Sequence, residues 1–145
     1  KMSTAPTESL SAPQIVALTQ SMLSTARVDG LHPNEEALIR RFYNEQWLAG
    51  MPSYEQATAA PAAALAPLAA DKAFGEQLIL MCLMAGYADG KLSAAERAHV
   101  ATLAQPLGVT GARIEELLMQ VKDSLLGSLA HLPDSESVAA LAKTL

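Results

Sequence analysis

Two nine-residue stretches of this chain, sixty positions apart, carry the same arrangement of acidic residues and glycine. In residues 28–36 and 88–96, an Asp-Gly pair is followed by a glutamate seven positions after the aspartate. The corresponding residues are Asp29 and Asp89, Gly30 and Gly90, and Glu36 and Glu96. Carboxylate oxygens are the ligands that hard divalent cations prefer. The repeat therefore predicts either a shared acidic metal site or two copies of one structural turn.

The electrostatics of the turns leave both explanations open. Each aspartate follows an expected helix, and the carbonyl end of a helix disfavours a nearby negative charge by up to about 1 kcal/mol. A cation beside the carboxylate would offset this cost. Alternatively, the acidic residues cap the following helices, because Asp-Gly is a common turn pair and Ser93 with Glu96 has the spacing of a capping box.

Two better-defined metal-binding motifs match these stretches only in part. The second stretch matches the last eight positions of an EF-hand loop, but Ala85 and Tyr87 occupy positions where that loop needs oxygen ligands. Glu96 and His99 form an E-x-x-H motif, and a di-iron bundle needs two of these. The first stretch offers Ile39 in place of the second histidine.

Nothing in the sequence pairs a nucleophile with a base. The single cysteine, Cys82, excludes an internal disulfide and a thiolate zinc cluster, and its apolar surroundings at residues 78–85 predict a buried side chain. Neither a G-x-S-x-G motif nor a glycine-rich phosphate loop is present. We therefore expect a protein that is not an enzyme, with a metal-dependent hydrolase as a distant alternative.

Composition favours an all-α protein and argues against binding to nucleic acids. Half of the 145 residues are hydrophobic but only 4% are aromatic, and an alanine-rich core of this kind favours helices. The net charge of −5 repels phosphate backbones. The longest apolar stretch, residues 57–70, contains two prolines and is too short to span a bilayer. We expect a cytoplasmic protein without direct membrane insertion.

Periodicity and capping patterns place the helices. Residues 1–10 are expected to be a flexible tail, and residues 11–145 a single domain. Helices are expected from Ser11 to Asp29, Pro33 to about Gly50, Ser53 to Pro61, Asp71 to Ala88, Ser93 to Gly108, from Thr110 past Leu126, and from Pro133 onwards. The alanine- and proline-rich residues 59–70 are either a linker or a short helix. The fold class is an all-α bundle of about seven helices with an internal duplication of a helical hairpin.

The expected helices also predict which residues form the core. Residues 78–85 are apolar around the whole helical circumference, which is typical of a helix in the middle of a bundle. In the second helix, Ile39, Tyr43 and Trp47 are expected on the core side, together with Leu38 and Phe42.

Residues 82–96, followed by residues 103–109, resemble the TerB-like family, which is named after bacterial tellurite-resistance proteins and also occurs beside J-domain co-chaperones. The resemblance covers roughly Ser11 to Leu126. It implies an all-helical fold with an internal duplication, in which each half carries an Asp-Gly turn followed by a glutamate. These acidic residues are thought to gather into a candidate divalent-metal site.

Carried over by position, the resemblance implicates Asp29, Glu36, Asp89 and Glu96 as metal ligands. The first half departs from the pattern, since Glu35 competes with Glu36 for the equivalent role.

The leading functional expectation is a non-enzymatic, stress-associated module that binds calcium, magnesium or manganese through its acidic turns. The alternative is a scaffold that binds another protein and uses the repeated acidic residues only as helix caps. The sequence specifies neither the partner nor the oligomeric state.

Overall fold

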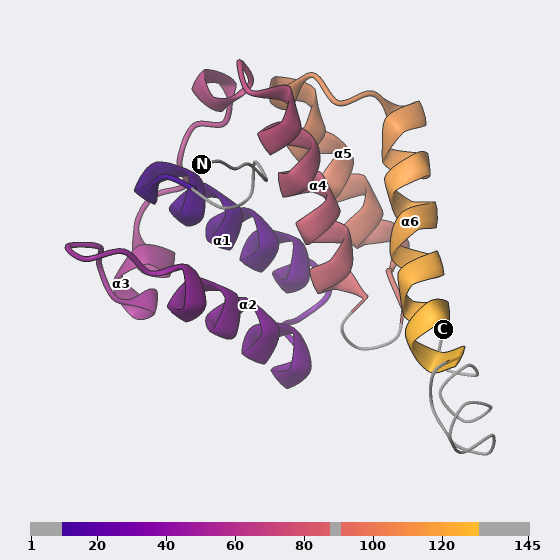
Figure 1. Ribbon diagram of the computed structural model, residues 1–145, viewed down its shortest axis with the longest axis horizontal. Coiled ribbons are helices and arrows are strands. Elements are labelled where there is room, and N and C mark those ends of the chain that lie inside the picture. Colours follow the sequence, from indigo (N-terminus) through magenta and orange to yellow (C-terminus); the bar gives the residue numbers. More distant parts are fainter. Residues whose placement is uncertain (1–9, 88–90, 131–145) are drawn as a thin grey trace, which may run out of the picture.

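The computed structural model describes residues 10–87 and 91–130, with side chains up to Ser124, and all regular elements in these ranges are helical (Figure 1). The elements are α1 (Ala12–Arg27), α2 (Pro33–Gln46), α3 (Tyr54–Ala59), the 3₁₀ helix η2 (Ala66–Leu68), α4 (Lys72–Gly86), α5 (Ala94–Leu107) and α6 (Gly111–Ala130). The all-α prediction is confirmed for these residues. The helix expected from Pro133 lies outside them, as does the tail at residues 1–9. None of the described helices combines the length and apolarity that a bilayer span requires.

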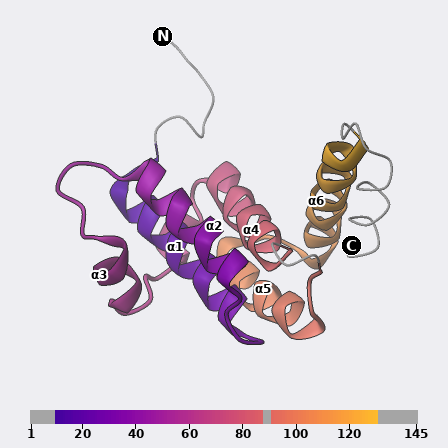
Figure 2. The same cartoon turned by 90° about the horizontal axis from the view of Figure 1, so that it is seen from below.

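Helix α4 lies at the centre of the bundle, as its apolar sequence predicts. It packs most extensively against α1 and also contacts α2, α5 and α6. Figures 1 and 2 show α1 and α2 on one side of α4 and α6 on the other. Its buried residues include Leu78, Ile79, Cys82 and Leu83, none of which exposes any surface. Two consecutive helix pairs, α1 with α2 and α4 with α5, therefore meet through α1 and α4.

Local capping contacts set most helix boundaries. Ser11 begins α1 with a reciprocal capping box, in which its hydroxyl oxygen accepts from the Gln14 N–H at 3.2 Å and its own N–H donates to the Gln14 amide oxygen at 3.0 Å. Ser53 does the same for α3. At the end of α5, Gly108 adopts φ 74°, which places the chain in the left-handed conformation that closes a helix. These boundaries agree with the sequence-based prediction.

The second helix ends earlier than predicted, and this exposes Trp47. Helix α2 stops at Gln46, so that Trp47 leaves the helical face that buries Ile39 and Tyr43, and 46% of its surface is exposed. Its indole N–H donates to the Pro52 carbonyl at 3.0 Å, and the Tyr43 hydroxyl donates to the same oxygen at 2.6 Å. The prediction of a core Trp47 was wrong because this carbonyl holds the indole beside the loop.

Most of the alanine- and proline-rich segment is irregular, with η2 as its only helical turn. Gln20 of α1 holds the start of this segment: its side-chain amide donates to the carbonyls of Ala57 and Pro61, both at 3.1 Å, and its oxygen accepts from the Ala63 N–H at 2.8 Å. The prolines prevent a regular helix here, and one α1 side chain satisfies backbone groups that such a helix would have paired.

Candidate functional site

The first predicted acidic turn connects α1 to α2 on the surface. Asp29 is exposed, and the next residue, Gly30, has φ 91°, a conformation that favours glycine. The Gly30 N–H closes the turn by donating to the Arg27 carbonyl at 3.1 Å. Among the described contacts, the Asp29 side chain does not cap α2.

Glu35, and not Glu36, is the residue that corresponds to Glu96. Helix α2 begins one residue earlier than an ungapped alignment of the two stretches assumes, so that Glu35 occupies the third helical position and is fully buried. Its carboxylate oxygen accepts from the His32 N–H at 3.1 Å. Of the two glutamates that compete for this role in the sequence, Glu35 therefore has the helical position of Glu96, and the assignment of Glu36 as a metal ligand stays a prediction.

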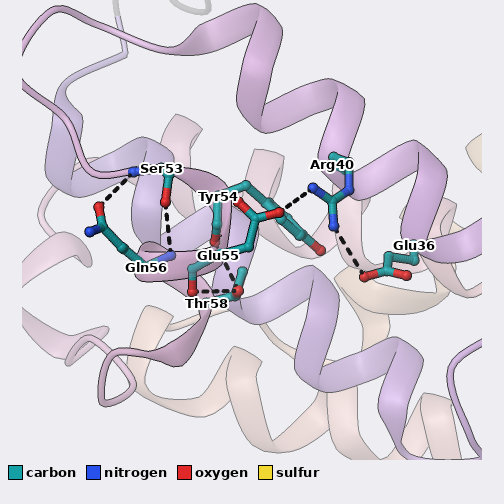
Figure 3. Close-up of polar contacts among 7 residues, drawn as sticks. All are labelled: Glu36, Arg40, Ser53, Tyr54, Glu55, Gln56 and Thr58. Carbon is teal, nitrogen blue, oxygen red and sulfur yellow. Dashed lines mark hydrogen bonds and ion pairs between the residues drawn. The ribbon is translucent and has the colours of Figure 1, made fainter.

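Glu36 instead belongs to a surface network that joins α2 to α3 (Figure 3). Its carboxylate lies 3.7 Å from Arg40, and both side chains are 43% exposed. Arg40 also bonds Glu55 at 2.5 Å and lies over the Tyr54 ring, 4.4 Å from its centre. The hydrogen bond from Arg40 lowers the pKa of the Glu55 carboxyl. Glu36 therefore has a structural partner of its own.

Glu96 is buried at the start of α5, where it completes a capping box. Its Oε1 accepts from the Ser93 N–H at 2.9 Å, and the Ser93 hydroxyl accepts from the Glu96 N–H at 3.0 Å. The carboxylate packs beside Gly86 at the end of α4: a Cβ added there would lie 3.7 Å from Oε1 and only 2.3 Å from the Leu92 side chain. The small residue at position 86 thus leaves room for the side chains of Leu92 and Glu96.

Three of the four predicted metal ligands, Asp29, Glu36 and Glu96, lie within the described residues. Asp89 lies outside the described residues. Within residues 10–87 and 91–130, no group of three histidine, cysteine, aspartate or glutamate side chains is arranged to hold a metal ion. Asp29 and Glu36 are accessible, whereas Glu96 is 4% exposed and engaged as a cap. Metal binding remains a prediction.

Two further candidate functional residues, His99 and Cys82, also make structural contacts. His99 of the E-x-x-H motif shares a hydrogen bond of 2.9 Å with Ser24, which links α5 to α1. Cys82 is fully buried in α4, and this burial raises the pKa of its thiol to about 12, although a hydrogen bond with Thr25 acts in the opposite direction. As predicted, Cys82 is a buried core residue.

The described residues form a groove of about 600 Å³ between α2, α4 and α6. Its lining residues are Asn34, Ala37, Leu38, Arg41, Leu80, Met84, Tyr87, Gln120, Val121 and Ser124. We call it the α2–α4–α6 groove. Arg41 is its one charged residue and forms no ion pair with another described residue. Figure 1 shows α2 and α6 flanking the end of α4 that contributes to it.

The sequence-based predictions did not include this groove, although the apolar composition of α4 indicated it. A helix that is apolar on all sides must be covered on all sides, and α4 is not: Met84 is 43% exposed, and Leu80 is only partly buried. The groove also lies close to the first acidic turn, because its lining residue Asn34 is the second residue of α2.

Comparison with protein-family models, curated proteins and solved structures finds no match to this chain.

Proposed function

We propose that this chain is a non-enzymatic protein-interaction module that binds an amphipathic helix of a partner protein in the α2–α4–α6 groove. The apolar, partly uncovered face of α4 carries this proposal. Helix-in-groove recognition needs an apolar floor with a polar rim, and here Leu80, Met84 and Val121 form the floor. Arg41 on α2 favours a partner helix with an acidic residue beside its apolar face.

The proposal is tested with a displayed library of helix-forming 15-residue peptides selected on the full chain. Selected peptides are expected to carry apolar residues spaced i, i+3, i+4 and i+7. Met84→Arg should weaken their binding at least tenfold in a polarisation titration. Met119→Arg is the matched control, since Met119 is 58% exposed on α6 but does not line the groove. Equal binding by the two variants, or no selected peptide, would overturn the proposal.

A second proposal retains the TerB-like resemblance: a cytoplasmic, stress-associated protein of about seven helices with a duplicated hairpin, whose acidic turns bind a divalent cation. One observation supports the duplicated hairpin of this proposal: each hairpin buries a glutamate, Glu35 or Glu96, at the third position of its second helix. Calorimetric titration of the metal-free chain with calcium, magnesium and manganese tests it. Binding should disappear when Asp29→Asn is combined with Asp89→Asn; no heat from any ion, or binding that survives this change, would exclude the site.

A further inference from the structure

The α2–α4–α6 groove is bounded by helical faces about two turns long. Helix α2 contributes residues with the spacing i, i+3, i+4 and i+7 of one continuous helical face; these are Asn34, Ala37, Leu38 and Arg41. Helix α4 contributes Leu80, Met84 and Tyr87, which are spaced i, i+4 and i+7. Seven residues of a helix extend about 10 Å. A partner helix that lies along α2 therefore meets two turns of groove wall, with Asn34 and Arg41 at its two ends.

Arg41 gives this groove a positive charge that the described lining does not offset. No acidic side chain is among the described residues that line the groove. Arg41 is exposed and forms no ion pair with another described residue. The preceding residue, Arg40, is instead engaged by Glu36 and Glu55. The charge of Arg41 is therefore available to a bound partner.

The net charge of the chain acts in the opposite direction. Its 15 acidic and 10 basic residues leave an excess of negative charge, which attracts basic partners. At physiological ionic strength the Debye length is about 8 Å, so charges elsewhere on the surface are largely screened from a helix in the groove. The Arg41 guanidinium lies within the groove itself, and it can bind a carboxylate through two hydrogen bonds. The local charge of Arg41 therefore outweighs the net charge for a docked helix.

We propose that Arg41 determines the specificity of the α2–α4–α6 groove. It selects amphipathic helices that carry a glutamate or aspartate beside their apolar face, and it rejects helices that carry a lysine or arginine at the same place. This selection rests on the proposed function, because it names the class of partner for the same groove. Rejection follows from the like-charge contact that a basic residue would make with Arg41.

A peptide library with fixed apolar positions tests the selection on the full chain. The 15-residue peptides carry leucine at i, i+3, i+4 and i+7, and the positions that flank this stripe vary between glutamate, glutamine and lysine. Selection on the unaltered chain should enrich glutamate over lysine at one flanking position by about fivefold or more, and selection on Arg41→Glu should reverse this preference. Lys72→Glu is the matched control, because it makes the same change of net charge at the first residue of α4, outside the described groove lining.

Polarisation titrations then separate attraction from repulsion. One selected peptide, and its counterpart with lysine in place of the enriched glutamate, are titrated with the unaltered chain, Arg41→Gln and Arg41→Glu. Arg41→Gln should weaken binding of the glutamate peptide by about two- to fivefold, as expected for an exposed ion pair. Arg41→Glu should make the lysine peptide the tighter ligand. Because Arg41 is exposed, both variants should retain the circular dichroism spectrum and melting temperature of the unaltered chain.

The outcomes distinguish the role of Arg41 from the existence of the binding groove. Equal enrichment of glutamate and lysine on the unaltered chain, or a glutamate preference that survives Arg41→Glu, would overturn the role of Arg41. A preference that Lys72→Glu removes to the same extent would assign it to net charge and also overturn that role. If Met84→Arg abolishes the binding of peptides that show no charge preference, the selection by Arg41 fails and the proposed function stands. If the library yields no peptide, both fail.

Discussion

Replacing Glu96 with alanine should lower the free energy of unfolding by about 2–3 kcal/mol, whereas the same change at Glu36 should cost no more than about 0.5 kcal/mol. At Glu96, the change removes a carboxylate that accepts from the Ser93 N–H at 2.9 Å and is 4% exposed. A hydrogen bond to a charged group contributes about 1.5–3 kcal/mol, and a negative charge at a helix N-terminus adds about 0.3–1 kcal/mol. Removing a buried charge recovers part of its desolvation cost, which keeps the net loss below the sum of these contributions.

At Glu36, the only described partner is Arg40, at 3.7 Å, and both side chains are 43% exposed. Exposed ion pairs of this kind typically contribute 0.2–1 kcal/mol, and pairs one helical turn apart about 0.3–0.5 kcal/mol. Glu35→Ala should resemble Glu96→Ala, because Glu35 is fully buried and bonds the His32 N–H. Comparison of the three variants therefore shows whether the buried cap in the first hairpin is Glu35 or, as the ungapped alignment assumes, Glu36.

Urea unfolding followed by far-UV circular dichroism measures these differences. With an m value of about 1.5 kcal/mol/M, Glu96→Ala should lower the midpoint by about 1.3–2 M and Glu36→Ala by no more than about 0.3 M. Glu96→Gln retains the accepting oxygen and should cost less than half as much as alanine. If Glu36→Ala shifts the midpoint as much as Glu96→Ala does, the assignment of Glu96 as a buried cap and Glu36 as a surface residue is refuted.

Three further predictions concern α4. Gly75→Ala should raise the melting temperature by about 2–4 °C, because a Cβ there would meet Leu107 at an ordinary 3.5 Å and alanine favours the helix by up to about 1 kcal/mol. Gly86→Ala should instead destabilise the fold by about 1–3 kcal/mol in the same thermal scan, because its Cβ would lie 2.3 Å from the Leu92 side chain; a gain in stability would contradict this packing. The Cys82 thiol should resist iodoacetamide at pH 8 until urea unfolds the chain, and rapid labelling of the folded protein would refute its burial. Since folding raises the pKa of this thiol from 9.0 to about 12, its contribution to stability should be complete below pH 9 and should be lost as the pH rises towards 12.

Much of the fold could be predicted because the information for helix ends is local. Ser11, Ser53 and Ser93 each lie three residues before a glutamine or glutamate, and each forms the reciprocal capping box that this spacing predicts. Gly108 ends α5 as expected, since few other residues adopt its positive φ at low cost. In each case the interacting groups lie within four residues of one another, so no knowledge of the tertiary structure was needed.

The two main differences from the sequence-based prediction lie at the ends of α2. Trp47 has the right spacing for the core face of α2, but the Pro52 carbonyl and the end of the helix at Gln46 hold it at the surface. Glu35 and Glu36 are adjacent and chemically identical, and only the starting residue of α2 determines which one is buried. A shift of one residue rotates a helical side chain by about 100°, which exchanges a buried cap for a surface partner of Arg40.

Helix α4 shows why the candidate site was the hardest feature to predict. Its apolar circumference placed it at the centre of the bundle, yet hydrophobicity alone does not say which neighbour covers each face. In the described residues, α1 packs most extensively against it, while the face with Leu80 and Met84 lies open between α2 and α6. Because contact between water and apolar side chains is unfavourable, an open apolar face on a central helix is a candidate binding surface. It can be recognised only once the positions of α2 and α6 are known, and these positions depend on contacts between segments far apart in the sequence.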